Sequence, residues 1–289
     1  MFLQFIANGI VIGSIYAIVS LGFALIYNTT KIFHLAYAVL YMFCPYMILT
    51  FFHGLGLNLF ISFTVAIIIT VFLSVIMEFL VYRPLAKKES SLNIMLISSI
   101  GIMIVVTNII SLFYGSETKI LNSEISKTFT IGNIILTYAQ ISQVSISMIL
   151  IVVFLLFLKF SRFGIMTRAM RDDDVLCQVL GMDIYKMRYV LFALSGLFSA
   201  IIGGLVAYDV GMDPYVGMPI LVNAVVALII GGIGRFEAPI IGGFIIGILQ
   251  ALSVWAFSAR WQDAVTFLLL IIFLLFRPTG ILAERKRLV

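Results

Sequence analysis

Long apolar stretches separated by short polar ones run along this chain of 289 residues. Several stretches reach the roughly 20 residues that a helix needs to cross a bilayer. They are continuous and do not alternate, which favours helices over a transmembrane barrel. The pattern predicts spans at about residues 3–27, 34–52, 57–81, 92–114, 141–160, 189–208, 239–257 and 264–276. A shorter apolar segment, 219–230, is either a ninth span or a re-entrant half-helix.

One polar interruption, residues 161–188, carries its own helix signals. Asp172, Asp173 and Asp174 offer an N-cap and negative charge at a helix N-terminus, and Gly181 stands where a C-cap glycine is expected. Four apolar residues between these signals make one stripe: Val175, Leu176, Val179 and Leu180. Because so short a helix is not stable in water by itself, it docks either on a partner protein or on the chain's own membrane domain.

Composition places the chain among polytopic helical membrane proteins. Hydrophobic residues make up 63% of it and charged residues 11%, whereas soluble globular proteins carry about 25% charged residues. We therefore expect an all-α protein with one membrane domain, residues 1–289, and eight or nine spans. The two cysteines, Cys44 in a span and Cys177 in the polar loop, predict neither a disulfide nor a metal site.

Basic residues are shared unequally between the two sides of the predicted bundle. Of the 18 lysines and arginines, 15 fall on one side and three, Lys119, Lys127 and Arg260, fall on the other. Because cytoplasmic loops carry the excess of lysine and arginine, we expect the polar loop and the C-terminus in the cytoplasm and the N-terminus outside. The net charge of +5 follows from this topology and does not indicate nucleic-acid binding.

Polar and aromatic residues in the first two spans are the candidates for a transport path. They are Asn8, Tyr16, His34, Tyr37 and Tyr41. Pro45 is expected to kink or break the second span, and irregular backbone at membrane depth is tolerated only against protein or a cavity. The alternative is a kinked helix that turns an aromatic face to its neighbours. Gly9 and Gly13 are spaced for close helix packing.

The sequence lacks the motifs of several function classes. No Gly-x-x-x-x-Gly-Lys-Ser/Thr motif occurs, so the chain has no P-loop, and no nucleophile–base constellation indicates an enzyme. No Asp, Lys or Arg sits in the middle of a span, and Glu78 is expected to pair with Arg83 or a neighbouring base. This disfavours proton-coupled carriers and leaves a conduit that draws its energy from elsewhere, although sodium sites built from carbonyls and hydroxyls stay compatible.

Five motifs, in order along nearly the whole chain, resemble the LivH-type permeases of branched-chain amino acid ABC importers. They are the opening helix with Asn8-Gly9, Gly13 and Tyr16-Ala17; Tyr82-Arg-Pro-Leu85; Arg168-Ala169 with Asp173 and Gly181; Gly231-Gly-Ile-Gly234 with Gly242-Gly243; and Phe276-Arg-Pro-Thr-Gly280. Each motif is weak alone, and their order and topological places make the set specific. The resemblance implies an ABC importer permease fold that works by alternating access.

The resemblance also implies partners. In this family the loop at 161–188 contacts the ATPase, so the expected coupling residues are Arg168, Arg171, Asp173, Val175, Leu176, Val179 and Gly181. Two cytoplasmic ABC ATPases bind the ATP in such importers, and this chain is expected to need no cofactor and to be no enzyme. A second permease (LivM-like or a second copy) and a periplasmic binding protein that delivers a small molecule complete the expected complex in the inner membrane, without nucleic acid.

Departures from the family pattern bear on the substrate. The run His34-Leu-Ala-Tyr-Ala38 replaces the usual Asn-Phe-Ala-His-Gly, Cys177 replaces a usual alanine, and Gln250 stands where an acid is frequent. The expected cargo is a branched-chain or other small hydrophobic amino acid, and urea or a short amide is the alternative within the same architecture. Outside it, the open alternatives are a stand-alone channel, a sodium-driven carrier, and a structural subunit whose loop docks a regulator.

Overall fold

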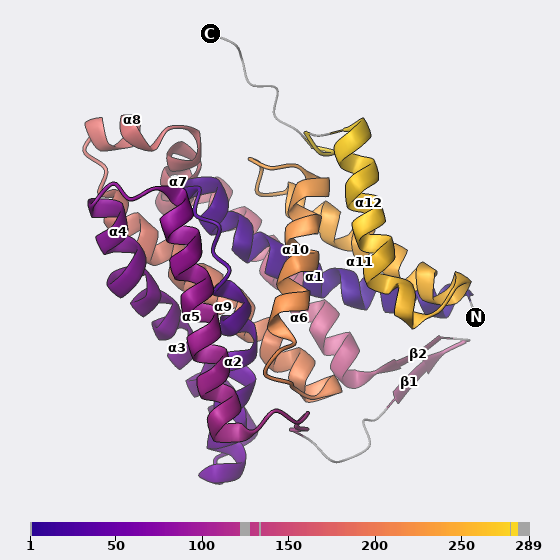
Figure 1. The fold of residues 1–289 in the computed structure, drawn as a ribbon. Coiled ribbons are helices and arrows are strands. Elements are labelled where there is room, and N and C mark those ends of the chain that lie inside the picture. Colours follow the sequence, from indigo (N-terminus) through magenta and orange to yellow (C-terminus); the bar gives the residue numbers. More distant parts are fainter. Residues whose placement is uncertain (1, 122–127, 133, 278, 283–289) are drawn as a thin grey trace.

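The computed structural model describes residues 2–121, 128–132, 134–277 and 279–282, and it is almost entirely helical (Figure 1). Within these residues, eight helical stretches are long and apolar enough to cross a membrane. They are α1 (Phe2–Thr30); α2 (Tyr37–Leu49) with the π-helical turn η1 (Thr50–Gly54); α3 (Leu59–Met77) with η2 (Glu78–Tyr82) and α4 (Arg83–Lys87); α5 (Leu92–Tyr114); α6 (Tyr138–Phe160); α9 (Ile184–Val210); α11 (Ala238–Ala256); and α12 (Gln262–Phe276) after the 3₁₀ turn η3 (Ala259–Trp261). The predicted polytopic helical class is confirmed.

Three shorter helices and a hairpin complete the fold. α10 (Gly217–Gly231) has 15 residues and is therefore about 22 Å long, less than the roughly 30 Å of a bilayer core. α7 (Arg162–Asp172) and α8 (Asp174–Val179) occupy the polar loop. β1 (Thr128–Ile131) and β2 (Ile134–Thr137) pair antiparallel. The hairpin and α7 were not predicted from the sequence.

α1 lies at the centre of the bundle, and α11 packs against it at close range (Figure 1). A Cβ placed on Gly9 would lie 2.8 Å from the Cα of Ile248, and one placed on Gly13 would lie 2.9 Å from the Cα of Phe244. Both distances are shorter than any real carbon contact, so glycine is what permits this approach. The predicted close packing at Gly9 and Gly13 is confirmed.

Pro45 was expected to kink or break the second span, and the structure shows that it does not break it. α2 begins at Tyr37 and continues through Pro45 to Leu49, where the backbone becomes π-helical. Proline removes the N–H that would bond to the carbonyl of Tyr41 four residues earlier. That carbonyl faces Gly203 of α9, where no side chain fits between the backbones. The close approach of α9 therefore covers the carbonyl that proline leaves without a helical partner.

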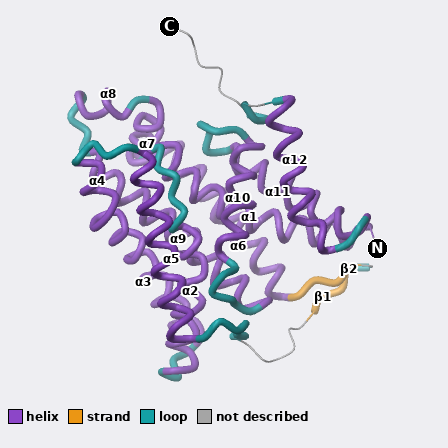
Figure 2. Tube along the Cα trace, viewed as in Figure 1, coloured by secondary structure: helices purple, strands orange, loops and turns teal. Residues whose placement is uncertain are grey.

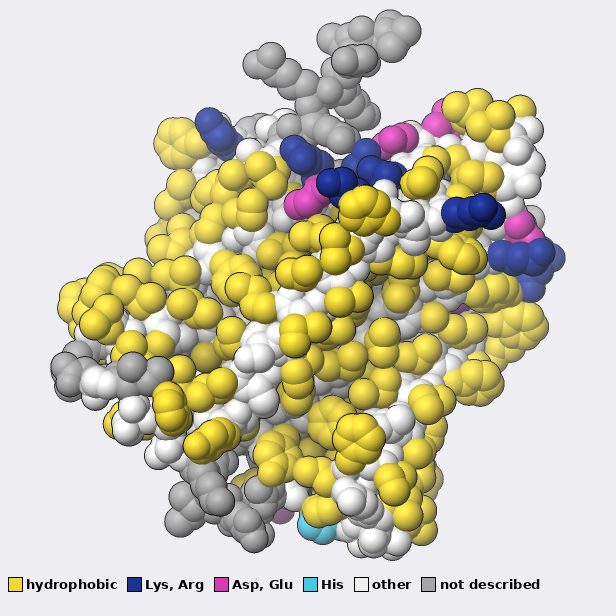
Figure 3. Space-filling model, turned by 180° about the vertical axis from the view of Figure 1, so that it is seen from behind, with side chains coloured by type: hydrophobic (Ala, Val, Ile, Leu, Met, Phe, Trp, Pro, Cys, Tyr) yellow, Lys and Arg dark blue, Asp and Glu magenta, His cyan; other side chains and the backbone are white. Residues whose placement is uncertain are grey.

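The bundle has two chemically distinct ends. Lys and Arg side chains gather across the end that carries α4, α7 and α8, which we call the basic end (Figure 3). The N-terminus lies beside the β1–β2 hairpin at the other end, the hairpin end (Figure 2). There the side-chain amide of Gln4 donates to the carbonyl of Ile135 at 2.9 Å and accepts from its N–H at 2.8 Å. Lys127 and the basic tail at 285–287 lie outside the described residues.

Candidate functional site

The polar loop at the basic end folds into two capped helices. Ser161 caps α7 by accepting a hydrogen bond from the N–H of Gly164 at 2.9 Å. Asp173 caps α8 by accepting from the N–H of Leu176 at 2.9 Å. α8 ends where Gly181 adopts a φ of +82°, a conformation that suits glycine. The cap signals read from the sequence therefore lie at both ends of α8, and Asp173 is the N-cap among the three aspartates.

The apolar stripe of α8 points away from the bundle. Val175, Leu176, Val179 and Leu180 are between 54% and 78% exposed, while Cys177 on the opposite side is 3% exposed. Burial raises the pKa of the Cys177 thiol, and the neighbouring aspartates raise it further. Among the described residues none covers the stripe, which leaves it accessible to a partner.

The two predicted coupling arginines differ in their surroundings. Arg168 is exposed on α7. Arg171 forms an ion pair with Asp172, with Nη2 2.7 Å from Oδ1, and its guanidinium lies 5.9 Å from the ring centroid of Phe236. Because Phe236 belongs to the loop between α10 and α11, Arg171 ties α7 to the C-terminal half of the bundle.

A hollow of about 520 Å³ lies between α8, α4 and the start of α9. Asp174 and Gln178 of α8 line one side of it, and Ala86 of α4 lines the other. Asp183 borders it and caps α9, and the backbone N–H of Lys186 lowers the pKa of that carboxyl. The hollow separates the exposed stripe from the membrane-spanning helices.

Arg188, which lines this hollow, forms a buried ion pair with Glu78. Its Nε and Nη2 donate to Oε1 and Oε2 of Glu78 at 2.5 and 3.0 Å. The prediction that Glu78 pairs with a base is confirmed, but the partner comes from α9 rather than from a neighbouring position. Arg83 instead donates to the hydroxyl of Tyr189 at 2.7 Å. The ion pair joins the π-helical turn after α3 to the helix that leaves the polar loop.

The five predicted path residues do not form one cluster. His34 lies 2.7 Å from the hydroxyl of Tyr82 through Nδ1, its ring contacts that of Tyr37, and burial lowers the pKa of His34 to about 3. Tyr37 and Tyr41 are also buried. Asn8 accepts a hydrogen bond from Gln4 near the hairpin end, at 3.1 Å. Tyr16 belongs to a separate polar network.

That network joins four helices around Gln250 of α11. The hydroxyl of Tyr16 donates to Oε1 of Gln250 at 2.9 Å. Nε2 of Gln250 donates to Oδ1 of Asn223 at 3.2 Å and to Oγ1 of Thr266 at 2.6 Å. Sequence reasoning missed Asn223 and Thr266, although each is an isolated polar residue within an apolar helix.

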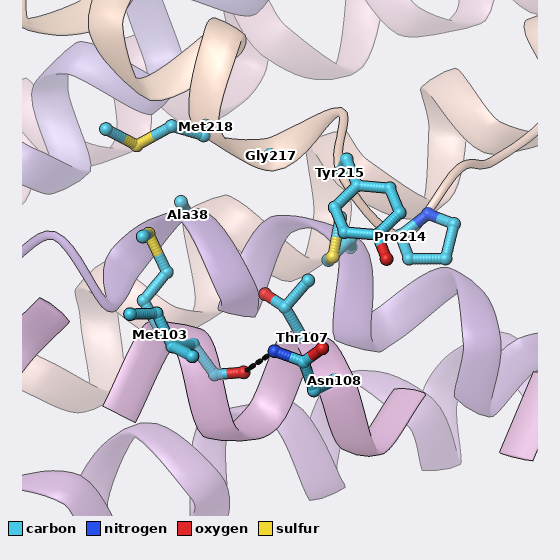
Figure 4. A pocket seen from close by; sticks show the side chains of 10 residues that line it. Ala38, Met103, Thr107, Asn108, Pro214, Tyr215, Gly217 and Met218 are labelled. Atoms are coloured by element: carbon cyan, nitrogen blue, oxygen red, sulfur yellow. Dashed lines mark hydrogen bonds between the residues drawn. The ribbon is translucent and has the colours of Figure 1, made fainter. Parts of the chain in front are cut away.

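A groove of about 180 Å³ lies between α2, α5 and α10 (Figure 4). Methionines from all three helices line it, and these flexible side chains adapt to the shape of an apolar ligand. Thr107 and Asn108 of α5 face Pro214 and Tyr215 across it (Figure 4). None of the five predicted path residues lines the groove. The lining residues are Ala38, Met42, Met103, Ile104, Thr107, Asn108, Pro214, Tyr215, Gly217 and Met218.

Comparisons with known proteins place this geometry in context. Residues 5–274 match the family described as the permease component of branched-chain amino acid transport systems. The chain is 32% identical to the high-affinity branched-chain amino acid permease LivH of Escherichia coli K12 and 28% identical to BraD of Pseudomonas aeruginosa, over 98% of this chain and 96% of each relative. It is 26% identical to a probable LivH of Methanocaldococcus jannaschii over 95% of this chain and 90% of that protein.

Proposed function

This chain belongs to the family of permease components of branched-chain amino acid transport systems, and on that premise we propose that it is the membrane subunit of an ATP-driven importer. Its cargo is a branched-chain or other small hydrophobic amino acid. Two cytoplasmic ABC ATPases bind and hydrolyse the ATP, and a periplasmic binding protein delivers the cargo. A second permease, LivM-like or a second copy of this chain, completes the membrane part.

The exposed stripe of α8 is the observation that carries this proposal. Val175, Leu176 and Val179 project into water at the basic end although they are apolar, and a helix-sized apolar face of this kind fits a groove on a partner. Asp173 and Gly181 hold the helix in this position from its two ends. Arg168 is exposed on the preceding helix beside the contact, whereas Arg171 joins that helix to Phe236 of the bundle. A moving ATPase therefore displaces α7 and α8 together.

The charge distribution supports the proposed orientation of the chain in the membrane. The basic end faces the cytoplasm under the positive-inside rule, which brings α7 and α8 to the ATPases. The N-terminus and the hairpin end then face the outside, where the binding protein delivers its cargo.

The groove between α2, α5 and α10 supports the substrate class. Its methionines suit a branched aliphatic side chain, and the hydroxyl of Thr107 offers a hydrogen bond to the polar end of an amino acid. Asn8, Tyr16, His34, Tyr37 and Tyr41 stay predictions from the sequence. Tyr16 is the one among them that is part of a hydrogen-bonded network crossing four helices.

The test compares two substitutions of the same kind at opposite ends of the bundle. Val179→Asp places a charge on the stripe, and Leu55→Asp places one at the hairpin end, at 78% and 65% exposed positions respectively. Tagged variants are purified from native membranes in mild detergent, the recovered chains are identified by mass spectrometry, and ATP-dependent uptake is measured in vesicles.

We expect wild type and Leu55→Asp to bring down a P-loop ATPase and to support uptake, and Val179→Asp to lose both while its yield stays unchanged. Equal recovery of the ATPase with both variants would overturn the coupling role of α8. Solute flux by the purified chain alone, without ATP, would overturn the importer and favour a channel or sodium-driven carrier.

A further inference from the structure

α5 turns a face to the outside of the bundle that is poorly suited to lipid. Gly101, Ile104 and Asn108 are exposed near the middle of this helix, and residues seven apart lie nearly above one another on a helix. We propose that this face packs against a transmembrane helix of a second permease chain. The inference rests on the function proposed above, because it presupposes that partner.

Asn108 lies deep in the bilayer. It stands five residues from the midpoint of α5, Met103, which is about 7.5 Å along the axis, whereas the hydrocarbon core extends about 15 Å from its centre. Its amide donates to the carbonyl of Ile104 at 2.7 Å. No described residue accepts from its second N–H or donates to its oxygen, and the side chain is exposed where lipid offers no hydrogen bond.

No other exposed carboxamide among the described residues lies within a span. Asn58 and Asn93 stand at the ends of helices, and Gln178 belongs to α8. In membranes, polar side chains of this kind hydrogen-bond across helix interfaces. The position of Asn108 is therefore that of an interhelical contact whose partner belongs to another chain.

Gly101 is a second, independent observation that favours a helix contact on this face of α5. No atom of the described residues lies within 4 Å of a Cβ placed there, whereas Cβ atoms placed on Gly9 and Gly13 would collide with α11. A mid-helix glycine weakens the helix, and in membranes small residues let a second backbone approach. Because no described residue occupies the space over Gly101, a helix of a second chain has room to approach there.

The groove beside this face is incomplete without a partner. Ile104, Thr107 and Asn108 line the groove, and Ile104 and Asn108 are also exposed on the surface of the bundle. A cargo that moves along the groove has to be shielded from the surrounding lipid. A second permease helix laid on α5 closes the groove on its open side and places Asn108 between two proteins.

α3 provides the matched control. It exposes Ile68 and Phe72 at mid-span, and its exposed Thr64 donates to the carbonyl four residues earlier at 2.9 Å, as Asn108 does. A side chain bonded in this way satisfies its own hydroxyl donor and needs no partner. The face of α3 therefore fits lipid, and it exposes no carboxamide or glycine at mid-span.

The first experiment is photo-crosslinking in native membranes. Cys44 and Cys177 are replaced by alanine, a benzophenone maleimide is attached to Ile104→Cys or Ile68→Cys, and adducts are identified by mass spectrometry. We expect Ile104→Cys to crosslink to a second polytopic chain or to a second copy, and Ile68→Cys to yield lipid adducts alone. A second permease that co-purifies but crosslinks from Ile68→Cys and not from Ile104→Cys would overturn the assignment.

The second experiment measures assembly. Asn108→Leu should reduce the second permease recovered with the tagged chain at least several-fold, while Thr64→Val leaves recovery unchanged, and the yield of the tagged chain should stay the same in both. Equal recovery with both variants would refute the contact at Asn108. Absence of any second permease from active wild-type preparations is a different result, because it would contradict the proposed importer itself.

Discussion

Replacing Arg188 by methionine should destabilise the bundle far more than replacing it together with its partner. The guanidinium and the carboxylate of Glu78 form two hydrogen bonds, at 2.5 and 3.0 Å, and the two residues are 7% and 0% exposed. Arg188→Met leaves the carboxylate buried and without this partner. Glu78→Leu combined with Arg188→Met removes both charges and fills the space with apolar atoms.

Removing one partner of a buried ion pair costs about 3–5 kcal/mol, whereas replacing both by apolar residues is close to neutral. Because a chain of this size loses roughly 2–4 °C per kcal/mol, Arg188→Met should lower the melting temperature by roughly 6–20 °C. The control is Lys186→Met, which breaks the exposed pair with Asp183. Exposed pairs contribute less than about 1 kcal/mol, so this variant should melt close to wild type.

Cys44 supplies the readout, because its thiol is fully buried. In a Cys177→Ala background, a thiol-reactive fluorescent dye reports unfolding of the membrane bundle in detergent. The reasoning is refuted if Arg188→Met and Lys186→Met have the same melting temperature. It is also refuted if Glu78→Leu combined with Arg188→Met lowers the stability by the sum of the losses of its two single variants. Either result would mean that the pair contributes no interaction of its own.

Three further predictions follow from local geometry. Below about pH 6.5, His34 should contribute a loss of roughly 1.4 kcal/mol of stability per pH unit, because an unfolded histidine takes up a proton there while burial holds the pKa of His34 at about 3. In a melting series against pH, His34→Gln should remove this contribution and give a shallower slope than wild type. Gly243→Val should reduce the melting temperature strongly, since a Cβ there would lie 2.6 Å from the Cα of Ala17, and Gly54→Ala, with its nearest atom at 3.9 Å, should not. Gly181→Val should lower ATP-dependent uptake and Gly181→Asn should retain most of it, because the φ of +82° suits asparagine far better than a β-branched residue.

The sequence by itself determined the features that depend on neighbouring residues. Apolar stretches of about 20 residues define spans whatever they pack against, and the structure has helices at each of these predicted places. Asp173 and Gly181 flank α8 because capping involves residues within one turn of each other. The spacing of Gly9 and Gly13 predicted a close helix contact, although it could not identify α11 as the partner.

Only the tertiary structure decided which distant residues meet. Glu78 pairs with Arg188, 110 positions away, rather than with Arg83, because α3 and α9 lie side by side. Gln250 gathers Asn223 and Thr266, and Asn108 borders a groove that three helices enclose. A sequence pattern records which side of a helix is polar, but the partner on that side depends on how the helices pack, and that packing is a property of the whole chain.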